Sequence, residues 1–90
     1  MKDTGMVTRE DRWVVMYWRH EPNGETVRRQ EGRYAVKSAA GRKGNELIAN
    51  KDVWRVEIYD RNEFGEELPA VGGTYWKTHG QLSENNNWPF

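Results

Sequence analysis

The chain of 90 residues contains no cysteine, only three prolines and no long hydrophobic run. Without cysteine it has no disulfide, no thiolate nucleophile and no zinc site built on thiolates, so we expect a cytoplasmic protein. No stretch approaches the roughly 20 apolar residues of a membrane-spanning helix, and the opening residues MKDTGMVTREDR lack the apolar core of a signal peptide. We therefore expect no association with a membrane.

Aliphatic residues are scarce, but aromatic residues are not. Hydrophobic residues make up 36% of the chain and charged residues 31%, whereas five Trp, four Tyr and two Phe raise the aromatic share to 12%. Each buried aromatic side chain removes roughly 150 to 250 Å² from water, so a few of them can build a core where aliphatic residues are few. The composition therefore predicts a folded domain rather than a disordered chain.

Three segments have the character of β-strands. Residues 13–18 are apolar at every position, and the PNG sequence at 22–24 suits the tight turn of a hairpin. Residues 26–30 would form the second arm, which is polar enough to belong at a sheet edge. Residues 53–59 alternate cleanly. We expect one face of this last strand to carry Trp54, Val56 and Ile58.

Between these strands, small apolar residues take the spacing of a helix. Val36, Ala39 and Ala40 stand at i, i+3 and i+4, which predicts one helix over residues 33–43. Because the side chains of its apolar face are small, this helix can approach a sheet closely. The order strand, strand, helix, strand predicts a small two-layer α+β domain, with a mainly antiparallel sheet and one helix on one face.

The remaining segments complete the predicted organisation. Weak strands are expected at 68–71 and 74–77, where Pro69 restricts the former to a sheet edge or a strand start. We expect residues 1–10 to form a flexible lead-in, residues 11–82 to form the single domain and residues 83–90 to form a tail.

A single helix covers one face of a sheet, whereas the first strand has two apolar faces. One face carries Val14, Met16 and Trp18, and the other carries Trp13, Val15 and Tyr17, which we call the Trp13 set. We expect the helix to cover one of the two sets. We expect whatever covers the Trp13 set to indicate the function. Three covers for the Trp13 set remain open: the tail through Trp88 and Phe90, a second copy of the chain, or a target protein.

The net charge is zero, but the charges are unevenly placed. Residues 1–43 hold ten Lys or Arg against six Asp or Glu, and residues 44–90 hold four against eight, so the two parts carry +4 and −4. The basic part could meet an acidic partner, or it could meet the acidic part of the same chain across the fold.

No motif indicates catalysis, a metal or a cofactor. His20 and His79 have no second ligand or acid at a suitable spacing. The acidic run that begins at Asp60 fails the calcium-loop pattern, because its fifth position is Phe64 and its twelfth is Gly72. The segments that pair glycine with lysine lack the phosphate-binding patterns. We therefore expect no catalytic residues, no metal and no cofactor.

The remaining features favour a small non-enzymatic protein-binding module, with a protein partner or a second copy as its target. The composition fits an accessory or inhibitor protein of a phage or mobile element. The predicted partner-binding residues are Trp13, Tyr17, Arg19, Arg28 and Arg29.

The alternative is a nucleic-acid-binding domain that uses the basic segment 28–43, in which cationic and aromatic side chains are interleaved. A competing interpretation is that this segment is a solvated surface whose cations pair with nearby carboxylates. The basic residues are Arg28, Arg29, Arg33, Lys37, Arg42 and Lys43.

Overall fold

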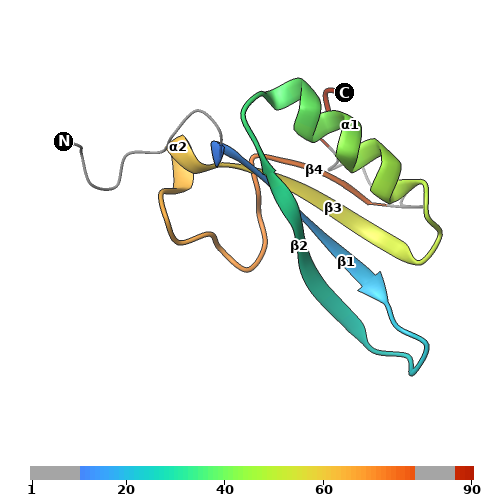
Figure 1. The fold of residues 1–90 in the computed structure, drawn as a ribbon. Helices are drawn as coiled ribbons and strands as arrows, with labels where there is room; N and C mark the ends of the chain where they lie inside the picture. Colours follow the sequence, from blue (N-terminus) through green and yellow to red (C-terminus); the bar gives the residue numbers. More distant parts are fainter. Residues whose placement is uncertain (1–10, 79–86) are drawn as a thin grey trace.

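A four-stranded antiparallel sheet with one main helix on one face makes up the domain (Figure 1). The computed structural model describes residues 11–78 and 87–90. The sheet order is β2-β1-β3-β4, and every neighbouring pair is antiparallel. The predicted α+β fold class is therefore confirmed. The elements are β1 (Trp13–His20), β2 (Thr26–Tyr34), α1 (Lys37–Ile48), β3 (Val53–Asp60), α2 (Arg61–Phe64) and β4 (Tyr75–Thr78).

The predicted boundaries differ most at the helix. It begins four residues later than predicted because β2 runs on to Tyr34, and it ends at Ile48. Gly41 and Gly44, which resemble helix-capping residues in the sequence, lie inside α1 and are buried. The weak strand predicted at 68–71 is not a strand. The predicted lead-in and residues 83–86 of the tail lie outside the described residues.

Two β-bulges shift the register of the sheet beside β1. One lies in β2 at Glu31, since Val15 pairs with Gly32 and Met16 with Gln30. The other lies in β3 at Trp54. An extra residue in a strand changes which side chains share a face.

The bulge in β3 overturns one prediction. Arg19 pairs with Val53 and Trp18 with Arg55, so Val53 rather than Trp54 joins the core face of β3. The Trp54 ring lies 6.3 Å from the rings of both Trp18 and His20, on the opposite face. The prediction that Trp54 shares a face with Val56 and Ile58 is therefore wrong.

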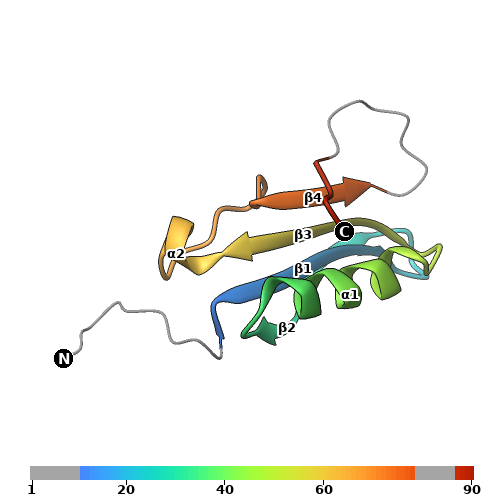
Figure 2. The ribbon, with the colours of Figure 1, turned by 90° about the horizontal axis from the view of Figure 1, so that it is seen from above.

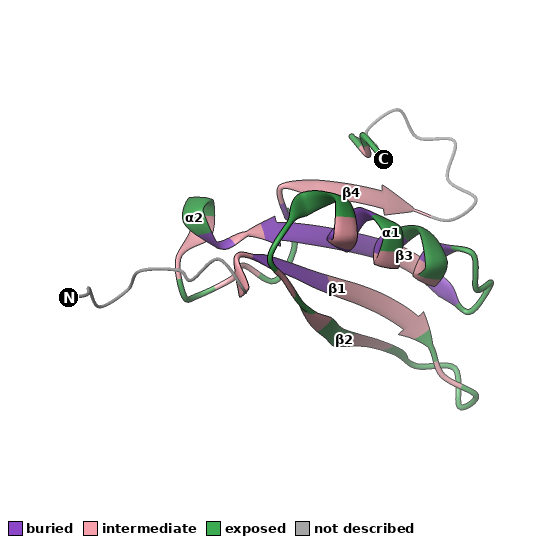
Figure 3. Ribbon diagram, turned by 45° about the horizontal axis from the view of Figure 1, so that its top comes forward, coloured by how far each residue is buried: buried purple, intermediate pink, exposed green. Residues whose placement is uncertain are grey.

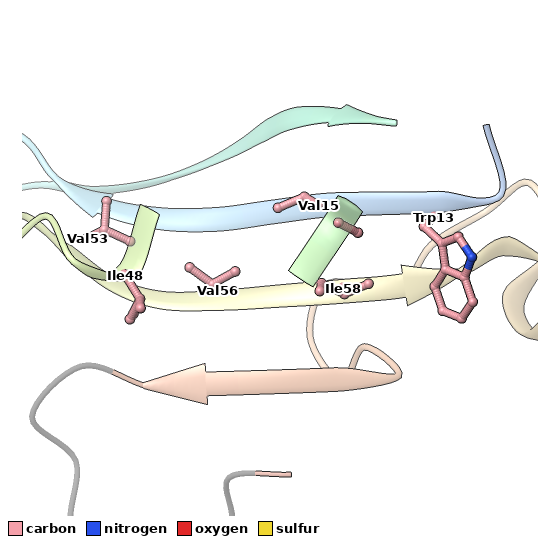
Figure 4. Packing of buried hydrophobic residues seen from close by; sticks show 7 residues of the cluster. Trp13, Val15, Ile48, Val53, Val56 and Ile58 are labelled. Carbon is pink, nitrogen blue, oxygen red and sulfur yellow. The ribbon is translucent and has the colours of Figure 1, made fainter. Parts of the chain in front are cut away.

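The core lies between α1 and one face of β1 and β3 (Figure 4). Its fully buried members include Val15, Val56 and Ile58, each 0% exposed, and Trp13 is 6% exposed. Figure 3 shows the same pattern, with buried residues concentrated in β3 and the first half of β1. The buried cluster consists of Trp13, Val15, Ala40, Ile48, Val53, Val56 and Ile58.

The helix therefore covers the Trp13 set, the reverse of the predicted arrangement. The physical reason is the register, because Val15 pairs with Ile58 and Tyr17 pairs with Val56, which places all four on the apolar face of β3. The apolar sequence of β1 is compatible with either face, so it could not distinguish them. The set with Val14, Met16 and Trp18 lies on the face away from α1.

A second cover lies on the same side as α1. Residues 87–90 cross beside the helix near β4 (Figure 2). Trp88 packs against the core cluster, and the Tyr75 ring contacts both Trp13 and Phe90. Of the three covers left open by the sequence, the structure therefore shows the tail, acting together with α1.

Asp60 fastens the end of β3 to the start of β1. Its carboxylate accepts hydrogen bonds from Arg12 Nε and Nη2, both at 2.8 Å, and from the backbone N–H of Asn62, which caps α2. The hydrogen bonds from Arg12 are the main cause that lowers the pKa of Asp60. The carboxylate is thus held in its charged form by the fold.

We expect Trp13→Ala to lower the free energy of unfolding by about 3 to 5 kcal/mol, because it empties a site in the core. Val36→Ala, at a side chain that is 54% exposed, is the control and should change little. Urea denaturation measures both. A loss at Trp13 no larger than the loss at Val36 would contradict the assignment of Trp13 to the core.

The dependence of stability on pH in acid tests the contact between Arg12 and Asp60. Because its pKa is lowered in the fold, Asp60 adds stability above its ordinary pKa of about 4, and this stability is lost as pH falls through the lowered value. Arg12→Gln should make the loss of stability below about pH 4 shallower in urea titrations. Arg29→Gln, whose ion pair with Glu21 is 3.4 Å long and more exposed, is the control. Equal slopes in both variants and the wild type would rule the linkage out.

Candidate functional site

The face of the sheet away from α1 has a buried carboxylate at its centre. Glu57 is 0% exposed, yet both of its carboxylate oxygens accept hydrogen bonds. It accepts hydrogen bonds from Arg55 Nε at 2.7 Å and from Tyr59 Oη, and its closest contact with Arg55 Nη2 is 2.6 Å. The backbone N–H groups of Gly72 and Gly73 donate to it at 3.2 and 3.1 Å. A buried charge is tolerated where it is paired and hydrogen-bonded in this way.

The loop between α2 and β4 (residues 65–74, the α2–β4 loop) is bound to the sheet through this carboxylate. A Cβ atom at Gly73 would lie 3.0 Å from the carbonyl oxygen of Ile58 and 3.2 Å from Glu57 Cβ. Gly72 has a φ of +94°, which side chains disfavour. The two glycines therefore allow the loop backbone to reach Glu57 and to cover one end of this face.

Tyr59 extends the cluster towards β2. Burial, followed by the hydrogen bond to Glu57, raises the pKa of Tyr59, so the phenol stays protonated and donates to the carboxylate. Its oxygen accepts a hydrogen bond from Arg28 Nη2 at 3.0 Å, and the same nitrogen donates to the carbonyl of Pro69 at 2.9 Å. Arg28 thus reaches from the edge strand across β1 to the loop.

Beyond the loop, the same face carries aromatic side chains that are only half-buried. We call this surface the open face. The guanidinium carbons of Arg28 and Arg55 lie 5.4 and 5.7 Å from the centre of the Trp18 ring, within cation–π range. Trp76 joins the surface because it pairs with Glu57 across the strands. The open face consists of Met16, Trp18, His20, Arg28, Trp54, Arg55 and Trp76.

Arg28 differs from Arg29 and Arg33 of the same strand in its partners, since those two pair with carboxylates. Within the described residues its hydrogen bonds go to a phenol and a carbonyl, and it makes no ion pair with a carboxylate. Its Nε and the Trp54 Nε1 are buried polar atoms that lack a hydrogen-bond partner there. Arg55 is neutralised by Glu57. The open face therefore holds one uncompensated cation and two unsatisfied donors.

The structure does not bring the predicted partner-binding residues together. Trp13 is buried in the core and Tyr17 packs against it, so both lie on the α1 side, whereas Arg28 lies on the open face. Arg29 is paired with Glu21, and the Arg19 Nε is buried without a partner among the described residues. Trp13 therefore shares no exposed surface with Arg28.

Of the seven residues of the open face, the sequence predicted only Arg28 as a partner-binding residue, and three of the others show why. Trp54 was placed on the wrong face because a one-residue bulge leaves no clear mark in the sequence. Arg55 carries no local signal of its place on this surface, because the burial of its partner Glu57 depends on residues far along the chain. Trp76 could have been found, because it alternates with Tyr75 and Lys77 in a strand that the sequence did predict.

The basic residues of segment 28–43 do not share one surface. Lys37 and Lys43 belong to α1, on the opposite side of the sheet from Arg28. Arg33 pairs with Asp11, and Lys43 pairs with two glutamates. Among the described residues, Arg12 and Asp60 form a long-range ion pair between the basic and the acidic part of the chain.

Within the described ranges, no group of three His, Cys, Asp or Glu residues could hold a metal ion. His79 lies outside these ranges. The helices of the described part include none long and apolar enough to cross a membrane.

Comparison of the whole chain with known proteins found no match to a protein-family model, to a curated protein or to a solved structure.

Glu57→Gln tests the buried cluster. The amide keeps the shape but removes the charge and turns an N–H₂ group towards donors, so we expect a loss of about 3 to 5 kcal/mol in the free energy of unfolding. Glu66→Gln is the matched control, because Glu66 also pairs with an arginine at 2.6 Å but is 61% exposed. Its loss should stay below about 1 kcal/mol. Similar losses in both variants by urea denaturation would show that Glu57 does not organise the face.

Proposed function

We propose that the chain is a non-enzymatic protein-binding module and that its contact surface is the open face. The observation that carries the proposal is Arg28, a half-buried cation with no carboxylate partner among the described residues. It lies between two aromatic rings, those of Trp18 and Tyr59. Tryptophan and arginine are the residues that most often supply the binding energy of protein interfaces.

The chemistry of the open face favours an acidic partner. The fork of an arginine guanidinium matches a carboxylate, and such charge-assisted hydrogen bonds are stronger than neutral ones. The carboxylate of Glu57 cannot fill this role, because it is buried and already accepts five donors. A rotation of Arg28 or Trp54 that presents its unsatisfied N–H to a partner's oxygen would also remove the cost of leaving it unpaired.

An acidic polypeptide is favoured over the other two partner classes. A nucleic acid binds through many phosphates, whereas the open face offers one uncompensated guanidinium and the net charge of the chain is zero. A dimer formed by two open faces would bring two uncompensated guanidinium groups into one interface without supplying a carboxylate. A target protein with an aspartate or glutamate beside an apolar side chain would supply a carboxylate for Arg28 and an apolar contact for the aromatic rings.

Two broader expectations remain part of this proposal. The lack of cysteine favours a cytoplasmic location. The small size and the aromatic-rich composition fit an accessory or inhibitor protein of the kind that phages and mobile elements encode.

The test is selection from a displayed library of random short peptides against the full chain. We expect the enriched peptides to carry an acidic residue next to an aromatic or aliphatic one. Arg28→Gln should weaken their binding about tenfold or more, because a hydrogen bond to a charged group is lost, and Trp18→Ala should weaken it similarly. Arg42→Gln, at an exposed position of α1, is the control and should bind like the wild type.

Two outcomes would overturn the proposal. One is enrichment of peptides whose affinity is the same for Arg28→Gln and for the wild type, with circular dichroism confirming that both are folded. The other is tighter binding of single-stranded RNA or duplex DNA in fluorescence anisotropy at about 50 mM salt, which would favour the nucleic-acid alternative.

A further inference from the structure

On the α1 side of the sheet, a groove between α1 and β4 holds the segment Asn87–Phe90. A Cβ atom at Gly41 would lie 2.3 Å from the Phe90 ring, and one at Gly44 would lie 2.4 Å from the Trp88 ring. The two rings pack edge to face at 5.1 Å. The two rings therefore occupy space that side chains at Gly41 and Gly44, one helical turn apart, would otherwise fill.

Polar contacts fix the register of this segment. The amide of Asn87 accepts a hydrogen bond from the backbone N–H of Trp76 at 2.8 Å and donates to the carbonyl of Thr74 at 3.0 Å. It thus uses the outer edge of β4 as a neighbouring strand would. The Trp88 Nε1 donates to Asn45 Oδ1 at 2.9 Å, so the polar end of the indole is also matched.

Three residues of this short segment make these contacts, namely Asn87, Trp88 and Phe90. Pro89 limits the backbone of the segment to extended conformations before binding. Phe90 remains 36% exposed and Trp88 is only half-buried, so the segment is seated at the surface of the domain.

We infer that this groove is a recognition site for an extended peptide of the pattern Asn-Trp-Pro-Phe, carried by a partner protein. The chain's own segment acts as a competing ligand in cis. The site is independent of the proposed function, because it lies on the other side of the sheet from the open face. A short connection gives the cis ligand an effective concentration on the order of millimolar, so it weakens a partner's binding without preventing it.

The experiment uses the full chain and a fluorescent synthetic peptide, Asn-Asn-Trp-Pro-Phe, the sequence of residues 86–90. The receptor is the double variant Trp88→Ala/Phe90→Ala, in which the cis ligand is weakened. We expect this variant to bind the peptide about tenfold or more tightly than the wild type does, because the competition is removed. A control peptide with alanine in place of tryptophan should not bind.

Gly44→Ala in the same double variant is the test of the site itself. Its methyl group occupies the place of the indole ring and lies 3.3 Å from Val56 Cγ1, while alanine is the better helix former, so the intrinsic helicity of α1 is not lowered by the change. We expect peptide binding to be lost with the helical circular dichroism signal retained. Binding that survives Gly44→Ala, or no binding to the double variant up to about 1 mM peptide, would overturn the inference.

A second measurement covers the case in which the double variant does not fold. The peptide is titrated into the wild type, and the indole N–H signal of Trp88 is followed by nuclear magnetic resonance. Displacement of Trp88 from Asn45 should shift this signal, and an unchanged signal at a saturating excess of peptide would overturn the inference. A wild-type dimer that Gly44→Ala abolishes would also overturn it, since the partner would then be a second copy of the chain.

Discussion

The burial of the Glu57 carboxylate is the constraint on which the rest of the outer face depends. A charge at that position is stable only if donors surround it, and the chain supplies them from β3 and from the α2–β4 loop. The loop is therefore drawn onto the sheet, Arg55 is held beside the Trp18 ring, and Tyr59 is oriented to receive Arg28. The positions of the two guanidinium groups on the open face follow from one buried side chain.

The two faces of the sheet are closed by different physical means. The α1 side relies on apolar contact, in which the helix lies close to the sheet through its small residues and the rings of residues 87–90 fill the space beside it. The other side relies on hydrogen bonds to a carboxylate and leaves the rings of Trp18, Trp54 and Trp76 half-buried. A chain with few aliphatic residues can thus stabilise one sheet on both faces.

The sequence was enough to predict the fold class, the hairpin and the strand at 53–59, because alternation and turn residues are local signals. It was not enough to predict which face of β1 meets the helix, since both faces are apolar and the pairing with β3 decides. Trp54 changed face through a bulge, and Gly44 resembled a cap although it seats a ring from 44 residues further along the chain. Glu57 has no local mark of burial, because the glycines that cover it come 15 and 16 residues later.

The amide of Asn87 has a consequence for aggregation. An exposed edge strand is a template on which another chain can add, and sheets that lack protection grow by this route. On β4 the amide of a single side chain occupies the N–H of Trp76 and the carbonyl of Thr74, and on β2 a bulge at Glu31 and flanking arginines interrupt the opposite edge. Both edges of the sheet are therefore poor templates for the addition of a strand from another chain.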